Sequence, residues 1–575
     1  MKTVRFASLR TTGKSDIAFQ IPNERSSNLD LIPAHLTRTT MRIPSAVVRP
    51  FGTIFVAFVV DIQWHQCSAF SASSVVLVVP AEATGPSKFG TLSPIDSCPT
   101  YEQAAQQLGK KLSFYNAEGD FRWRVCTADT LVAANAVVED GPPGSDANVI
   151  IALGLSTAAE MSNLQTVFEQ RRQQSKHNDQ LCHFTVDCCE SLPALVGPLD
   201  TAAPIPSPLV LLPWTQLASA QRLHDQLQGL FERWTTDDFC YGVTLFLNQF
   251  VAPVNWVRHR TDATWEKGPV QNVREFYAMA TQCNDCLVSC VQDDQCRTCL
   301  SKLTELDPRD QATSYRTIVS YESDLLTKIS LCMFTKKNIF QCDASIPTKP
   351  VVPPLSQWRG RPLTKEVGRS LLVGHLQDEA TALPQAQQLP VSWKVACGAN
   401  VAYDQFPSQN QLFYPAASSG TNAANMWYDP VFRVETLDGR HVWCKRHYRV
   451  QQQTAATFRL SVSDNGVTSD EFWTIVGAAP DLSWIVFHYA GAAKTIGQRY
   501  LGGLVCTPDG TMPPSQDTET LQEIWECLQA AGIEPWELYA VDNGQDTPGA
   551  RAAGPPPLTF YRDLIAKRRK SAQVA

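Results

Sequence analysis

Short runs in which apolar and polar residues alternate fill the chain between residues 393 and 510. A period of two is typical of strands that bury one face. Turn signals separate the runs, and the clearest are Asp438-Gly439 and Asn465-Gly466. Such pairs favour tight hairpins because both residues tolerate a positive φ. The pattern therefore predicts a closed antiparallel β-barrel with room for one small ligand. Its predicted strands are residues 431–436, 441–450, 457–463, 471–476, 483–490 and 500–507.

The pattern changes ahead of the barrel. Short apolar runs such as residues 148–153 and 207–212 suit buried strands, and residues 217–234 have helical periodicity. We predict a small α/β domain over residues 96–265. It contains no glycine-rich nucleotide loop and no serine nucleophile elbow, so the sequence assigns it no role.

Two segments flank the predicted barrel, which we bound at residues 385–515. A proline-rich stretch marks a linker over residues 346–384. After the barrel, residues 517–531 are amphipathic, and Gly532 ends the pattern. We expect this helix to pack on the barrel wall, within a C-terminal segment (516–575) that ends in a basic tail. Its apolar face carries Leu521, Ile524, Trp525 and Leu528.

The N-terminal region, residues 1–95, has the pattern of a targeting presequence and linker. Arg42 and Arg49 precede an apolar run at 51–60, and the small residues Cys67-Ser68-Ala69 precede Phe70. This order predicts a signal peptide at about 41–69, because a run of ten apolar residues is too short to span a bilayer. The serine-rich transit segment from Phe70 resembles the presequence of algae with secondary plastids. The alternative is a buried strand at 51–60.

Composition narrows the class of protein. At 575 residues the chain is longer than one core usually fills, so two or three domains are expected. The formal net charge of −7 provides no broad basic field. We therefore expect no nucleic acid partner.

Cysteines gather in a predicted helical segment, residues 275–345. Two C-x-x-C pairs could bind zinc, although the loop between them is short and contains no histidine. Alternatively, helical spacing puts Cys283, Cys286 and Cys290 on one face, so that disulfides would staple two short helices. Free thiols are the third possibility, and the disulfide interpretation is the one we adopt. The seven cysteines of the segment are Cys283, Cys286, Cys290, Cys296, Cys299, Cys332 and Cys342.

Taken together, the patterns predict an α+β multidomain protein, in which an α/β domain and Cys-rich helices precede a barrel. Several motifs of the C-terminal half also resemble one known family. They are the segments AYDQFP, NMWYDPVF, DNGV and EFWTIV at residues 402–407, 425–432, 464–467 and 471–476. These segments resemble the lipocalin domain of the violaxanthin de-epoxidase family, and most closely its violaxanthin de-epoxidase-related branch.

The resemblance covers roughly residues 280–545 and implies a function. A lipocalin-like barrel would hold an epoxy-xanthophyll of the violaxanthin or diadinoxanthin type and open its epoxide reductively, with ascorbate as co-substrate. The resemblance also implies disulfides in the Cys-rich segment, no metal, and a location in the chloroplast, in the thylakoid lumen or at the thylakoid membrane surface.

Epoxide opening requires an acid, because an alkoxide is a poor leaving group. Two acidic positions of the family are Pro407 and Gln498 in this chain, which leaves Asp404 and Tyr500 as the predicted catalytic residues. Asp429 precedes a proline and is more typical of a turn. The predicted substrate-binding residues are Trp393, Gln409, Gln411, Tyr428, Tyr489 and Gln498.

The replaced acids leave other hypotheses open. The barrel is a non-catalytic carotenoid-binding lipocalin in one, and an epoxy-xanthophyll isomerase in another. A further hypothesis places the function in the α/β domain and makes the barrel a partner-binding platform. A carboxyl group that lines the barrel interior would distinguish catalysis from binding alone.

Overall fold

The structure is a computed structural model of the chain. All the residues it describes belong to one compact unit, Asp61–Ala575. The predicted signal peptide, Asp404 and Cys342 lie outside the described residues. The described residues are 73–81, 86–91, 93, 98–115, 121–131, 147–174, 182–188, 195–196, 229–240, 242–243, 269–305, 311–340, 346–374, 392–400, 406–415, 425–494 and 498–544.

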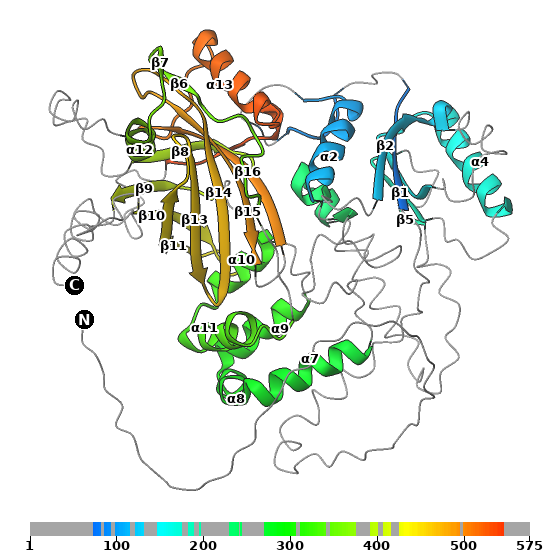
Figure 1. Ribbon diagram of the computed structural model, residues 1–575. Coiled ribbons are helices and arrows are strands. Elements are labelled where there is room, and N and C mark those ends of the chain that lie inside the picture. The colour runs from blue at the N-terminus through cyan, green and yellow to red at the C-terminus, as the bar shows by residue number, and fades with distance from the viewer. Residues whose placement is uncertain are drawn as a thin grey trace, which may run out of the picture. The chain divides into compact units, whose positions relative to one another are not determined.

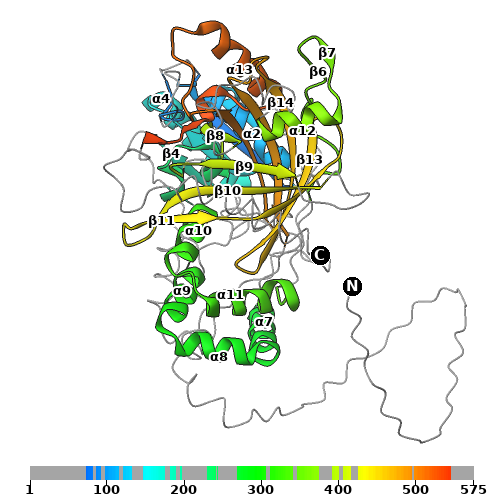
Figure 2. The same ribbon diagram turned by 90° about the vertical axis from the view of Figure 1, so that its left-hand side faces the viewer.

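A closed ring of antiparallel strands forms the predicted barrel (Figure 1). The ring runs β8–β9–β10–β12–β13–β14–β15–β16 and returns to β8, because β9 pairs with both β8 and β10. Beside β12, β11 pairs with the far half of β10, and β9, β10 and β11 run side by side in Figure 2. The bounds are β8 Trp393–Gly398, β9 Asn410–Pro415, β10 Asn425–Glu435, β11 His441–Lys445, β12 Tyr448–Gln452, β13 Thr457–Asp464, β14 Val467–Ala478, β15 Ile485–Ala493 and β16 Gln498–Thr507.

Both predicted hairpin turns are present. Gly439 has a φ of 78°, and Asn465 and Gly466 have φ values of 46° and 80°. The strand predicted at 441–450 is divided into β11 and β12. It breaks at Arg446, whose guanidinium group pairs with the Asp464 carboxylate.

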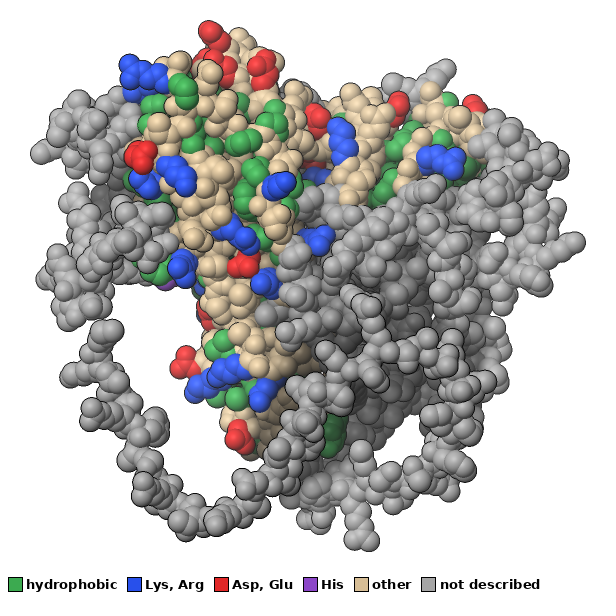
Figure 3. Space-filling view, viewed as in Figure 1, with side chains coloured by type: hydrophobic (Ala, Val, Ile, Leu, Met, Phe, Trp, Pro, Cys, Tyr) green, Lys and Arg blue, Asp and Glu red, His purple; other side chains and the backbone are tan. Residues whose placement is uncertain are grey.

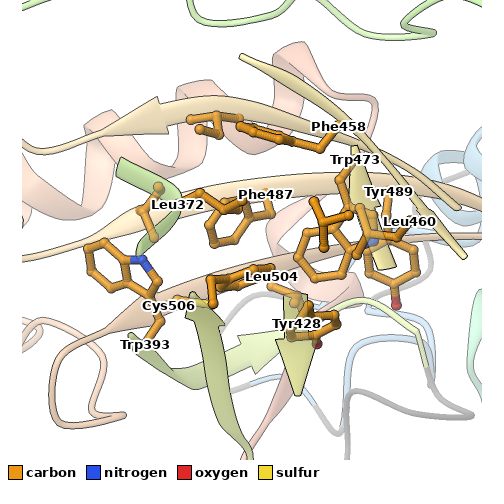
Figure 4. Close-up of a cluster of buried hydrophobic side chains, with 14 of the residues drawn as sticks. Leu372, Trp393, Tyr428, Phe458, Leu460, Trp473, Phe487, Tyr489, Leu504 and Cys506 are labelled. Atoms are coloured by element: carbon orange, nitrogen blue, oxygen red, sulfur yellow. The ribbon is translucent and has the colours of Figure 1, made fainter. Parts of the chain in front are cut away.

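Large apolar side chains from alternate strand positions fill the barrel interior. Figure 4 shows Trp393 and Leu372 at one end of this cluster, and Trp473, Tyr428 and Tyr489 toward the other. Closure of the ring shields these side chains from water, and Trp393 is only 1% exposed.

A short helix packs at the Trp393 end, within the segment predicted as a linker. Thr364 caps the start of α12 (Lys365–Val373), and Gly374 ends it with a φ of 79°. The buried Leu371 gives its carbonyl to the Trp393 indole N–H at 3.0 Å. A hairpin of β6 (Gln357–Trp358) and β7 (Arg361–Pro362) precedes the helix. The linker is therefore more ordered than the proline content predicted, because its apolar residues pack on the barrel.

Helix α13 (Thr518–Ala530) follows the barrel, as expected from the amphipathic pattern. Asp517 caps it, and Ile524 and Leu528 are its buried residues. They pack with Val486 and Val505 on the outer face of β15 and β16. The strand β17 (Tyr539–Ala540) then pairs with β8.

The Cys-rich segment is helical. Disulfides join Cys283 to Cys332 and Cys290 to Cys296, whereas Cys286 and Cys299 are free thiols. The prediction that Cys286 and Cys299 take part in disulfides is thus wrong, since the other cysteine of each C-x-x-C pair forms a disulfide with a partner outside the pair. The helices are α7 Pro269–Gln282, α8 Asn284–Gln292, α9 Asp294–Glu305, α10 Gln311–Ser320, α11 Asp324–Ser330 and the π-helical turn η2 Leu331–Lys336.

These helices contact the barrel at the turn between β13 and β14. Thr335 of η2 donates its hydroxyl to the Gly466 carbonyl at 2.6 Å. Gly466 approaches the backbone at Ser330 so closely that a Cβ there would collide with it. The disulfide Cys283–Cys332 thus anchors the helical turn that holds this hairpin.

The α/β domain contains a five-stranded sheet in the order β2-β1-β3-β4-β5. β1 (Ser73–Val79) is flanked in parallel by β2 (Phe121–Thr127) and β3 (Ala147–Leu153), and β4 (Cys182–Val186) continues the sheet. The short β5 (Leu195–Val196) is antiparallel. Helices α2 (Tyr101–Tyr115) and α4 (Ala158–Gln174) cover opposite faces of β1, since α2 packs with Leu77 and α4 with Val76.

The central strand of this sheet falls inside the predicted presequence and linker. Residues 75–79 are apolar without alternation, because parallel strands are buried on both faces. A run of this kind resembles the apolar part of a targeting segment. The α/β domain therefore includes β1, which lies ahead of the boundary predicted at residue 96.

On the face shown in Figure 3, described Lys and Arg side chains lie among acidic and apolar ones. Among the residues described, no helix is both long enough and apolar enough to cross a bilayer.

We expect the two disulfides to differ in their contribution to stability. Cys283–Cys332 closes a separation of 49 residues and Cys290–Cys296 one of only 6. Chain entropy then assigns about 4 kcal/mol to the first and about 2 kcal/mol to the second. Thermal unfolding of the two double Cys→Ser variants would show the larger loss for Cys283/Cys332. Cys286→Ser is the matched control, and equal melting temperatures for all three variants would contradict the assignment.

Candidate functional site

A carboxyl group lines the barrel interior on β14. Strand alternation puts Glu471 on the same face as Trp473 and Ile475, whose side chains belong to the interior cluster. Phe472 points to the other face, where it packs with Ile346. Glu471 is 7% exposed, so its carboxyl group lies within the closed ring.

Two donors hold this carboxyl group. The Trp473 indole N–H donates to Oε2 at 2.6 Å, and the Tyr500 hydroxyl donates to Oε1 at 2.8 Å. Burial raises the pKa of Glu471 above its ordinary value of 4.5, and these hydrogen bonds counter the rise only in part. Glu471 therefore keeps its proton to a higher pH than an exposed glutamate does.

Glycines opposite the interior tyrosines make room for this arrangement. Gly491 on β15 pairs with Glu471 on one side and with Tyr500 on the other. A Cβ on Gly491 would collide with the Tyr500 ring. Gly502 stands in the same relation to Tyr489, because its Cβ would strike the Tyr489 hydroxyl.

Aromatic rings fill the interior beside this carboxyl group, and Figure 4 shows Tyr428, Trp473 and Tyr489 among them. The Trp473 ring lies 5.5 Å from Tyr489 and 5.4 Å from Tyr428, measured between centroids. The Tyr428 ring stacks on Phe413 at 4.4 Å. Stacked and edge-to-face rings offer an apolar, polarisable lining that suits a conjugated ligand, and these rings must move apart to admit one.

A second polar group faces the same interior. Gln411 on β9 is 1% exposed, and its Oε1 accepts a hydrogen bond from the Tyr428 hydroxyl. Its Nε2 is buried without a hydrogen-bond partner. The interior therefore has two polar positions, at Glu471 and at Gln411, with Tyr428 and Trp473 between them.

The structure places the other predicted site residues as follows. Tyr500 contacts Glu471, and Tyr428 and Tyr489 line the interior. Trp393 lies at the end covered by α12. Gln409 is fully buried beside β8, where its carbonyl accepts from the Val395 N–H at 3.1 Å. Gln498 begins β16, but its side chain lies outside the described residues, as does all of Asp404.

Asp429 is a strand residue and not the turn residue expected. It lies on the outer face of β10 and is fully buried. The Tyr414 hydroxyl donates to its Oδ2 at 3.0 Å, and His447 Nδ1 lies 2.6 Å from Oδ1. Lys445 Nζ is 3.4 Å from Oδ2. Asp429 thus belongs to an ionic cluster outside the barrel, away from the interior that Glu471 faces.

Sequence reasoning missed Glu471. The signal was present, because Glu471 opens the segment EFWTIV and has the same strand parity as Trp473. A carboxylate in an apolar strand normally points outward. Glu471 can therefore be recognised as an interior residue only when the structure shows which face of β14 lines the barrel. Within the described chain, no group of three or more His, Cys, Asp or Glu side chains is arranged to hold a metal ion.

We expect Gly491→Ala to destabilise the barrel by about 1–3 kcal/mol, the usual range for overpacking. The added methyl group would strike the Tyr500 ring. Thermal unfolding would measure the effect, with Gly109→Ala as control because that site on α2 has open space. In a Tyr500→Ala background the same Gly491 change should be tolerated. An equal penalty in both backgrounds would refute the steric explanation.

A model of one protein family agrees with the barrel and the helices before it. Residues 275–543 match the family model described as the VDE lipocalin domain. Among solved structures, the chain is similar to lobster apocrustacyanin A1, with 11% identity over 36% of this chain and 97% of that chain and a TM-score of 0.21. It is also similar to the bovine lipocalin allergen Bos d 2, with 8% identity over 26% of this chain and 88% of that chain and a TM-score of 0.19. No curated protein matches the chain. Since the matched segment contains the disulfide-linked helices, the barrel and α13, residues 275–543 of this chain form a VDE lipocalin domain.

Proposed function

We propose that the barrel binds an epoxy-xanthophyll and opens its epoxide reductively, with ascorbate as the electron donor. The observation that carries this proposal is the buried Glu471 carboxyl group, whose pKa is raised by burial inside an aromatic-lined barrel. The VDE lipocalin domain supports the class of ligand and co-substrate.

The proposed reaction balances in atoms and electrons. The epoxide oxygen takes up two protons and leaves as water, both carbon–oxygen bonds break, and a carbon–carbon double bond forms. Ascorbate supplies two electrons and two protons and is oxidised to dehydroascorbate. The acid matters in the first step, because protonation of the ring oxygen turns a poor leaving group into a good one.

Glu471 and Tyr500 together suit that first step. When Glu471 is protonated, its Oε1 can donate to the Tyr500 oxygen, which frees the tyrosine proton for the epoxide. The contact of 2.8 Å between these oxygens allows such a transfer. In this proposal Glu471 is the proton source and Tyr500 the group that delivers the proton, while Asp404 remains a predicted second acid.

A binding-only function is the second candidate. Pro407 and Gln498 stand where family resemblance predicts acidic residues, so a carotenoid-binding lipocalin without turnover is compatible with this chain. An epoxy-xanthophyll isomerase would use the same acid without a reductant. Family resemblance and the presequence pattern also support a location in the chloroplast, at or inside the thylakoid.

We expect Glu471→Gln to lower turnover of violaxanthin or diadinoxanthin with ascorbate by at least ~100-fold, the usual contribution of a general acid. Pigment binding should change little, because Gln keeps the size of the side chain. Pigment analysis of timed incubations measures turnover, and Glu523→Gln on the exposed face of α13 is the control. Wild-type binding without turnover would favour the binding-only function, and unaltered turnover in Glu471→Gln would exclude Glu471 as the acid.

The pH dependence of stability should also reveal Glu471. Its pKa is raised by burial, so between pH 4.5 and that raised pKa the folded chain keeps a proton that the unfolded chain has released. Stability therefore falls as the pH rises through this window. Melting temperatures across pH for wild type and Glu471→Gln should converge below the window and diverge above it, with wild type the lower. A difference that does not vary with pH would contradict a raised pKa.

A further inference from the structure

The side-chain amide of Gln411 has an unpaired donor inside the barrel, as far as the described residues show. Its backbone is fixed, because its carbonyl accepts from the Ser392 N–H at 2.9 Å and the residue pairs with both Trp393 and Pro430. Its side chain is 1% exposed, and among the described residues Nε2 has no hydrogen-bond partner, although Oε1 accepts from the Tyr428 hydroxyl. A buried polar group left unpaired costs about 1–3 kcal/mol, so its persistence calls for an explanation.

A trapped water is a poor explanation. A buried water typically makes about three hydrogen bonds to polar groups. The strand neighbours of Gln411 are Trp393 and Pro430, and neither side chain faces it with a spare acceptor oxygen. A ligand atom remains as the partner that would complete the amide.

We propose that Gln411 is a specificity-determining residue, whose amide binds a hydroxyl group on the end ring of the pigment. A hydroxyl group both donates and accepts, so it completes the amide whichever of its two ends is unpaired. A carotene, which is a pure hydrocarbon, would leave the amide buried and unpaired. The barrel therefore selects hydroxylated carotenoids over carotenes of the same carbon skeleton.

This inference rests on the proposed function. The end ring of an epoxy-xanthophyll carries both a hydroxyl group and an epoxide oxygen. The interior offers two polar positions, Gln411 and Glu471, with the Tyr428 and Trp473 rings between them, whose centroids are 5.4 Å apart. Gln411 would bind a hydroxyl group of the pigment, and Glu471 would act on its epoxide.

Binding of two probes to the full chain tests the proposal. Zeaxanthin has hydroxylated end rings, and β-carotene has the same skeleton without oxygen. We expect wild type to bind zeaxanthin about fivefold or more tightly than β-carotene, as measured by quenching of tryptophan fluorescence, because an unpaired amide costs at least that factor. Gln411→Leu should abolish the preference, chiefly by weakening zeaxanthin binding.

Controls separate this inference from a folding defect. Gln411→Met keeps the volume and flexibility of the side chain, so the preference should also be lost in that variant while the melting temperature stays near that of wild type. Gln451→Leu, at an exposed position of β12, should leave both affinities unchanged. Equal binding of the two pigments by wild type, or a preference retained in Gln411→Met, would overturn the role of Gln411 while leaving Glu471-dependent turnover intact. Failure of wild type to bind either pigment would overturn this role and the proposed function together.

Discussion

Closure of the sheet by β9 is the constraint on which the site depends. β9 pairs with β8 through Trp393 and Gln411 and with β10 along its whole length, so no strand of the ring has a free inner edge. Closure excludes water from the inner face, and that exclusion raises the pKa of Glu471. The same closure leaves the Gln411 amide without solvent to satisfy it. Closure of the ring therefore accounts for both the raised pKa of Glu471 and the unpaired amide of Gln411.

The sequence was most informative where local chemistry decides the structure. Hairpins at Asp438-Gly439 and Asn465-Gly466 and the helix capped by Asp517 follow from turn and cap preferences that operate within a few residues. These rules need no knowledge of distant partners, so the barrel and the helix on its wall could be predicted. The resemblance to the violaxanthin de-epoxidase family added the class of barrel and agrees with the matched family model.

Features that depend on distant contacts escaped prediction. β1 has no alternation because both its faces are covered, and only the sheet distinguishes it from a targeting segment. Likewise, Cys283 forms a disulfide with Cys332 and not with Cys286, which is nearer in the sequence, because the packing of η2 brings Cys332 close. Glu471 was overlooked because its role arises from Gly491 and Tyr500 across two strands. Its neighbours along the chain give its strand parity with Trp473, but not the contacts with Gly491 and Tyr500.

The ring-filled interior has a consequence for the timing of ligand uptake. Phe413, Tyr428 and Trp473 are in mutual contact, with centroids 4.4 to 6.0 Å apart, so a rigid polyene cannot slide between them while they are stacked. Entry must wait for a fluctuation that separates the rings. The rate of uptake then reaches a ceiling set by the protein, and raising the pigment concentration beyond it brings no further gain. A barrel of this kind would exchange its ligand slowly and hold it for long periods.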